Sequence, residues 1–179
     1  MRHIIIEGPD GSGKTTLFNY LLDRDFTFQP HKRASTSVGG PVSDLEQWVV
    51  DDMVNLSTAM PSVYDRHPLI SEPIYGPTCR GRAKPPFGDM SWVFVQQEAL
   101  AKEALVIFCC PPLTVVRENV RVEQQMPGVA ANLAELFALY QLASLAWPGV
   151  QIRYDYTRHN QGALLNHIDT IFGRYADVP

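Results

Sequence analysis

The sequence predicts an α/β protein of three layers, α/β/α, in which roughly five parallel strands are covered by helices on both faces. Short apolar, β-branched runs alternate along the chain with longer segments of helical periodicity. The first run, His3–Glu7, leads directly into a glycine-rich turn and then into a helix. This order is typical of a parallel sheet that binds ligands at the carboxyl ends of its strands.

Five runs are predicted as strands because they are apolar and are stopped by Gly, Pro or Asp. They lie at residues 3–7, about 26–37, 61–65, 105–110 and 150–154. Six segments with apolar residues at helical spacing are predicted as helices that begin near residues 17, 43, 89, 113, 133 and 164. Ser43 and Glu46 form a plausible capping box, Asp89 can cap its helix, and Met90 and Phe94 are expected on the buried side of that helix.

The composition is that of one globular, soluble domain. With 179 residues and 20.1 kDa, we expect a single domain over residues 1–179. The net charge of −4 provides no overall field that would attract nucleic acid. The three cysteines lack metal-ligand spacing, which favours buried free thiols in a reducing cytoplasm. Neither a signal peptide nor an apolar run long enough to span a bilayer is recognised, so a cytoplasmic protein without a membrane partner is expected.

Residues 67–88 are predicted as a long, semi-rigid loop because prolines and glycines are dense there. Long ordered loops at the carboxyl edge of a sheet are commonly functional, so this segment is assigned to the acceptor side of a site. It contains a basic cluster, Arg80, Arg82 and Lys84. A smaller cluster at residues 31–33 is explained at least as well by solvated loop charges.

The glycine-rich turn matches the pattern Gly-x4-Gly-Lys-Ser/Thr in full. Its glycines let successive backbone N–H groups point into one concavity, which holds a β-phosphate. Lys14 would reach the β- and γ-phosphates, and the Thr15 hydroxyl is placed to bind Mg2+. The sequence therefore predicts a P-loop NTPase fold that binds ATP or GTP with magnesium, the alternative being a glycine-rich turn without a ligand. The predicted nucleotide-binding residues are Gly8, Pro9, Asp10, Gly11, Ser12, Gly13, Lys14, Thr15 and Thr16.

Transfer to an acceptor is favoured over hydrolysis. No Asn-Lys-x-Asp run for guanine recognition occurs, and Asp65 is followed by Arg66 instead of a glutamate that would polarise water. Asp65 could complete the Mg2+ shell or take a proton from an acceptor hydroxyl, although it could also simply cap a turn. Arg66 could clamp an acceptor phosphate through two hydrogen bonds.

Two further arginines are candidates for charge neutralisation. Arg117 and Arg121 lie four residues apart, hence on one helix face, in a lid-like helical region at about 113–128. A mobile lid could bring both over the transferring phosphoryl group. The alternative is an ordinary surface helix in which Glu118 and Glu123 pair with them.

Residues 5–16 resemble the phosphate loop of thymidylate kinases, which implies that Asp10 faces the acceptor nucleoside. The run Asp65–His67, with Ser71 and Tyr75 downstream, is similar to that family's Asp-Arg-Tyr motif and the Ser and Ala-Tyr-Gln that follow it. The two downstream residues each stand one position further from the aspartate than in the family, and a glycine replaces the glutamine. The paired arginines of residues 113–128 resemble the family's lid arginines.

Residues 65–76 and 109–112 resemble bacteriophage relatives of thymidylate kinase. That group includes kinases that phosphorylate the hydroxymethyl group of 5-hydroxymethyluracil within DNA during thymidine hypermodification. The resemblance implies an ATP-dependent kinase with Mg2+ and a thymidine-like acceptor. We expect 5-hydroxymethyluracil in DNA, with a free deoxynucleoside monophosphate such as dTMP as the alternative and host cytoplasm as the location if the chain is phage-encoded.

The expected catalytic residues are Lys14, Asp65, Asp10, Arg66, Arg117 and Arg121, with Thr15 and Asp65 binding the metal. The expected acceptor-binding residues are Asp10, Arg66, Tyr75, Arg80 and Arg82, and a displaced base could stack on Trp48, Tyr75, Phe87 or Trp92. Either Asp10 or Asp65 orients the acceptor oxygen. The oligomeric state is open, a dimer included, and two rival functions are a small-metabolite kinase and a non-enzymatic, nucleotide-dependent binding module.

Overall fold

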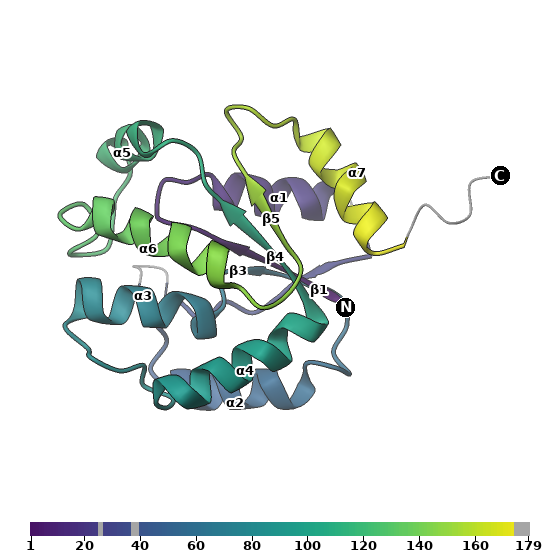
Figure 1. Cartoon of the computed structure of the whole chain (residues 1–179), viewed down its shortest axis with the longest axis horizontal. Coiled ribbons are helices and arrows are strands. Elements are labelled where there is room, and N and C mark those ends of the chain that lie inside the picture. Colours follow the sequence, from purple (N-terminus) through teal and green to yellow (C-terminus); the bar gives the residue numbers. More distant parts are fainter. Residues whose placement is uncertain (25–26, 37–39, 174–179) are drawn as a thin grey trace.

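The computed structural model describes residues 1–24, 27–36 and 40–173 (Figure 1). Its strands are β1 (His3–Glu7), β2 (Gln29–Pro30), β3 (Ser62–Asp65), β4 (Ala104–Cys109) and β5 (Gln151–Tyr154). Its helices are α1 (Lys14–Arg24), α2 (Leu45–Asn55), α3 (Pro68–Arg80), α4 (Met90–Glu103), α5 (Leu113–Val122), α6 (Leu133–Ala146) and α7 (Gln161–Ile171). None of the helices in these ranges is both long enough and apolar enough to cross a bilayer.

All five strands run parallel in the order β2-β3-β1-β4-β5, with Ile4 of β1 opposite Val63 of β3 and Leu105 of β4. The predicted second strand is confirmed as the short β2, which lies within its expected range, and the limits of that range, residues 26 and 37, lie outside the described residues. Because β1 is central, the glycine-rich turn that follows it emerges between the carboxyl ends of β3 and β4. In open α/β sheets this is where ligands bind.

Alternate residues of the strands face two separate cores. Ile4 and Ile6 of β1 pack with buried residues of α1 and α7, whereas Ile5 packs with α2, α3, α4 and α6. Figure 1 shows these two helical layers on opposite sides of the sheet. The buried, β-branched pattern of β1 follows from this double coverage, and the predicted three-layer α/β/α class with five parallel strands is confirmed.

Residues 67–88 are not one long loop, because α3 occupies their first half. His67 caps this helix, with its Nδ1 accepting a hydrogen bond from the Leu69 N–H at 3.2 Å. Pro73 inside the helix removes the N–H that would bond to the Leu69 carbonyl. Gln97 of α4 donates its side-chain N–H to that carbonyl at 2.7 Å instead. The loop prediction was wrong because a contact between helices offsets the local cost of the proline.

Two further local predictions were wrong. The capping box of Ser43 and Glu46 does not form, since α2 begins at residue 45 without a side-chain cap. Asp89 does cap α4, accepting a backbone hydrogen bond at 2.9 Å. However, Met90 and Phe94, which were expected on the buried side of α4, are 38% and 58% exposed. The three cysteines are free thiols, as predicted, but only Cys109 is buried, whereas Cys79 and Cys110 are partly exposed.

Candidate active site

The glycine-rich turn already has the shape of an anion site. Lys14 is the first residue of α1, and its Nζ donates to the Pro9 carbonyl at 2.7 Å. The Ser12 backbone N–H points to the same carbonyl at 3.4 Å, so two donors converge inside the turn. Burial lowers the pKa of Lys14 to about 8. Thr15 and Thr16, in the first turn of α1, are exposed, and their hydroxyls are open to a ligand.

Two residues that the sequence analysis missed hold this turn from outside. The Asn119 side chain on α5 donates to the Gly11 carbonyl at 2.7 Å and to the Tyr156 hydroxyl at 2.8 Å. Gly11 and Gly13 have φ of +72° and +82°, and a Cβ on Gly13 would lie 2.9 Å from the Tyr156 ring. A Cβ on Gly11 would lie 3.0 Å from the Val116 carbonyl. The glycines are therefore required both by backbone conformation and by close packing.

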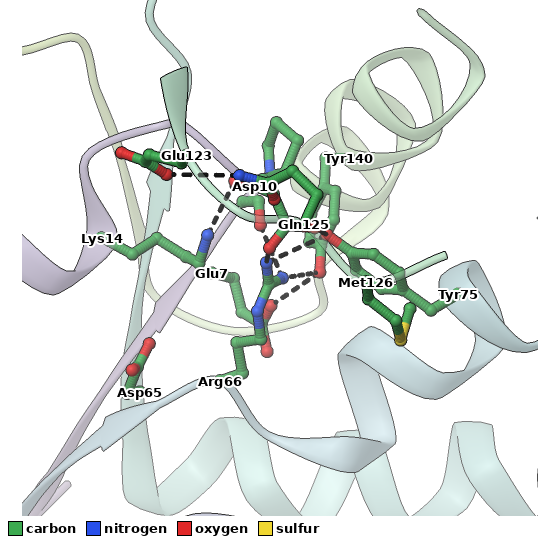
Figure 2. A network of polar contacts seen from close by, with 12 residues as sticks. Glu7, Asp10, Lys14, Asp65, Arg66, Tyr75, Glu123, Gln125, Met126 and Tyr140 are labelled. Atoms are coloured by element: carbon green, nitrogen blue, oxygen red, sulfur yellow. Dashed lines mark hydrogen bonds and ion pairs between the residues drawn. The ribbon is translucent and has the colours of Figure 1, made fainter. Parts of the chain in front are cut away.

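Arg66 is the centre of the polar network beside the turn (Figure 2). Its Nη1 donates to the Gly8 carbonyl and to the Tyr140 hydroxyl, each at 2.6 Å. Its Nη2 donates to Asp10 Oδ1 and to the Tyr75 hydroxyl, each at 2.9 Å. Arg66 also has φ of +72°, a conformation that costs a residue with a Cβ about 1–2 kcal/mol. Bidentate binding of an acceptor phosphate by the Arg66 guanidinium would require several of these hydrogen bonds to break.

Glu7, at the end of β1, lies beneath this network and was also missed. Its Oε1 accepts the His67 backbone N–H at 2.7 Å, and its Oε2 accepts the Tyr140 hydroxyl at 3.1 Å. Burial raises the pKa of Glu7 to about 7 against the opposing charge of Arg66. A glutamate in an otherwise apolar strand next to the turn was the available signal, because such a residue must find partners when it is buried.

The pKa of Asp10 is lowered, in contrast to the raised pKa of Glu7. Burial alone would raise its pKa, but the charges of Arg66 and Lys14 and the hydrogen bond from Tyr75 outweigh burial and lower it. The Tyr75 hydroxyl donates to Asp10 Oδ2 at 2.7 Å. Asp10 is therefore an ionised hydrogen-bond acceptor at neutral pH.

Asp65 ends β3 and is paired with Arg33, whose Nη2 lies 2.7 Å from Asp65 Oδ2. Arg33 belongs to the cluster at residues 31–33, for which either a small basic patch or solvated loop charges were expected. The Arg33 side chain is 52% exposed, and such ion pairs contribute little and exchange readily. The Asp65 carboxylate and the Thr15 hydroxyl are hard oxygen donors of the kind that Mg2+ takes, so the donor set fits the expected metal.

A cleft of about 470 Å³ opens beside the turn. This volume falls within the range of about 300–1,000 Å³ that is common for small-molecule sites. Gln125 and Met126, from the segment after α5, lie over the network at the edge of the cleft (Figure 2). The charged and aromatic residues that line it are Asp10, Asp65, Arg66, Glu72, Tyr75 and Arg80.

The structure does not bring the predicted lid arginines to this cleft. Arg117 and Arg121 are exposed, and neither makes an ion pair with any carboxylate of the described residues. α5 turns Val116 and Asn119 toward the phosphate turn. At about 100° per residue, the two arginines fall to one side of that contact face.

The remaining acceptor-side candidates are separated. Arg80 is the last residue of α3 and lines the cleft, whereas Arg82 is exposed and lines a neighbouring pocket. Tyr75 lines the cleft, but Phe87 is 5% exposed and packs against Trp92 with ring centroids 6.0 Å apart. Trp48, the fourth stacking candidate, packs edge-on against the rings of His31 and His67 instead.

Comparison with known proteins shows which class of fold this is. No protein-family model and no curated protein sequence matches the chain. Among solved structures, the chain shares its fold with a protein bound to a guanine nucleotide, with a deoxyadenosine kinase and with a sugar kinase.

One such structure is the Bacillus subtilis YorR protein in complex with phosphorylated GDP, with a TM-score of 0.72, 14% identity and 99% coverage of both chains. Another is deoxyadenosine kinase from M. mycoides with the products dCMP and dCDP, with a TM-score of 0.61, 12% identity, and coverage of 94% of this chain and 99% of that chain. A third is a sugar kinase from Janibacter sp., with a TM-score of 0.53, 16% identity, and coverage of 95% and 93%.

Proposed function

We propose that the chain is an ATP-dependent kinase that uses Mg2+ and transfers a phosphoryl group to a hydroxyl of a thymidine-like acceptor. The observation that carries this proposal is the cleft beside the phosphate turn, because Asp10 belongs to both. A triphosphate held by the turn and an acceptor held in the cleft would be neighbours, which is the main requirement for phosphoryl transfer. The shared fold with P-loop kinases supports the same class of reaction.

Each residue of the site has a separate role in the proposed reaction. Lys14 and the N–H groups of the turn hold the β- and γ-phosphates, and Thr15 and Asp65 supply oxygen ligands for Mg2+, which neutralises phosphate charge when bound. Asp10 accepts a hydrogen bond from the acceptor hydroxyl and orients it. As the acceptor oxygen bonds to the γ-phosphorus, the bond to the bridging oxygen breaks and ADP leaves, with Asp10 or Asp65 receiving the proton.

The charges in the cleft favour a neutral hydroxyl over a monophosphate as the acceptor. Both guanidinium groups of the lining are already ion-paired, Arg66 with Asp10 at 2.9 Å and Arg80 with Glu72 at 2.6 Å. A monophosphate brings a charge of about −2 and would need a free cation there. We therefore favour the hydroxymethyl group of 5-hydroxymethyluracil in DNA over dTMP. Arg82 and Lys84 are exposed and could bind the phosphates of a DNA strand.

An acceptor comparison tests this proposal. ATP labelled at the γ-phosphate is incubated with Mg2+ and either a single-stranded oligonucleotide containing 5-hydroxymethyluracil or free dTMP. We expect label in the oligonucleotide and none in dTMP. Label in dTMP alone would replace the DNA acceptor by a nucleoside monophosphate. Tight ATP binding without transfer to any nucleoside, nucleotide, sugar or DNA offered would contradict the kinase and support a nucleotide-dependent binding module.

Nucleotide affinity is expected to depend on pH through Lys14. The pKa of Lys14 is lowered to about 8 in the free protein, and bound phosphates would raise it because they favour the charged ammonium. Binding then takes up a proton above pH 8, so affinity falls by up to about tenfold per pH unit as pH rises. The phosphate's own titration lies lower, near pH 6. Calorimetry at pH 7, 8 and 9 should show this decline, and an affinity constant across that range would contradict it.

A further inference from the structure

Glu72 and Arg80 form an incomplete ion pair at the α3 side of the cleft. They lie eight residues apart on α3, and Arg80 Nη2 contacts Glu72 Oε1 at 2.6 Å. Their side chains are 7% and 15% exposed, respectively, and both line the cleft. Arg80 Nη1 also lies 3.8 Å from the sulfur of Met126, which lines the same cleft. The Arg80 guanidinium therefore contacts both Glu72 and the segment after α5.

The pair leaves one acceptor and one donor unused. Glu72 Oε2 and Arg80 Nε are buried, and neither has a hydrogen-bond partner among the described residues. Guanidinium and carboxylate groups often meet through two parallel hydrogen bonds, but here there is one. An unmade hydrogen bond of a buried polar atom costs about 1–3 kcal/mol, and more when the group is charged. Arg66, in the same cleft, differs from Arg80, because its two Nη atoms donate four hydrogen bonds to oxygen atoms.

We propose that Glu72 and Arg80 recognise the hydrogen-bonding edge of a nucleobase. A base edge with an N–H next to a carbonyl or ring-nitrogen acceptor complements them, because the N–H donates to Glu72 and Arg80 donates to the adjacent acceptor. Because Glu72 Oε2 is buried in the free protein, binding requires the carboxylate to turn about its last bond, a torsion with a broad energy profile. Tyr75 and Met126 line the same cleft and offer aromatic and polarisable surface to a ring.

This inference rests on the proposed function and restricts the range of acceptors that the site could bind. The edge that Glu72 and Arg80 would read is the one that pairs with the opposite strand in duplex DNA. A base in this subsite must therefore be unpaired, either in a single strand or turned out of the helix. The Glu72 carboxylate also disfavours any anionic group at this end of the cleft, in agreement with a neutral acceptor.

Thymidine and 3-methylthymidine test the subsite directly, because they differ only by a methyl group in place of the N3 hydrogen. Calorimetric binding to the full chain should favour thymidine by about tenfold to a hundredfold, the value of one hydrogen bond to a charged group. In Glu72→Ala the ratio should approach one. In Glu72→Gln, which keeps the volume and an acceptor oxygen but removes the charge, the ratio should fall several-fold. Glu98→Gln, an exposed glutamate on α4, is the matched control and should keep the wild-type ratio.

Equal affinity of the wild-type protein for the two nucleosides, or an unchanged ratio in both Glu72 variants, would overturn the subsite. If Glu72→Ala does not fold, as judged by circular dichroism, Glu72→Gln alone decides. The subsite and the kinase proposal fail separately. Phosphate transfer to an acceptor with no dependence on the N3 hydrogen rejects only the subsite. Preference for thymidine in a protein that transfers no phosphate rejects only the kinase.

Discussion

Replacing Lys14 with methionine is expected to reduce phosphate transfer by at least about 100- to 1,000-fold, the effect of removing one preorganised charged donor from a transition state. The Lys14 ammonium lies inside the phosphate turn on the Pro9 carbonyl, and a triphosphate would take the place of that carbonyl as its partner. Methionine has a similar length and no charge, so the fold should be retained. The measurement is the initial rate of labelled phosphate transfer, together with a circular dichroism spectrum.

Lys102→Met is the control for this change. Lys102 lies in the last turn of α4 and is exposed, so its removal subtracts the same charge from the protein without touching the turn. It should leave the transfer rate within about twofold of wild type, because a surface charge outside the site contributes little. A Lys14→Met protein that keeps wild-type turnover would show that the turn does not hold the reacting phosphates.

Arg66→Met is expected to lower the free energy of unfolding by about 2–4 kcal/mol, because several acceptors would lose a charged donor at once and each unmade hydrogen bond of a buried group costs about 1–3 kcal/mol. Arg66 donates to the Gly8 carbonyl, to two tyrosine hydroxyls and to Asp10, and these acceptors would lose their donor together. Asp10, whose side chain is 29% exposed, would lose its ion-pair partner and keep only the charge of Lys14 nearby. Urea unfolding monitored by fluorescence measures the change.

Arg158→Met provides the comparison for an exposed arginine. Arg158 pairs with Asp155 at 3.6 Å, and its side chain is 76% exposed. Its loss should cost no more than about 1 kcal/mol. If the two variants lose the same stability, the hydrogen bonds of Arg66 are not stabilising the region between the phosphate turn and α3.

The phosphate turn could be predicted because its function depends on residues adjacent in the sequence. Glycines, a lysine and a threonine at fixed spacing define it, and the alternation of apolar runs and helices defines the sheet around it. The partners of Arg66 could not be predicted in the same way. Tyr75 lies nine residues after Arg66, but Tyr140 is 74 residues away on α6, and only the tertiary fold brings it beside Arg66.

The errors on the acceptor side have a common physical cause. Prolines predicted a loop, but Pro73 is tolerated in α3 because Gln97 satisfies the carbonyl that the proline leaves unbonded. Once that segment is a helix, Glu72 and Arg80 come to lie on one side of it, and the arginine expected on a basic loop becomes half of an ion pair in the cleft. Nothing in the local sequence of a proline-rich segment indicates that a residue eight positions away is a partner.

The contacts of Asn119 have a thermodynamic consequence. Because this side chain joins α5 to the Gly11 carbonyl and to Tyr156, any displacement of α5 must either break these bonds or distort the turn. The shape of the turn and the position of α5 are thus linked equilibria, and linkage is reciprocal. A ligand that fixes the turn would fix α5, and a partner that holds α5 in place would strengthen the affinity of the turn for phosphate.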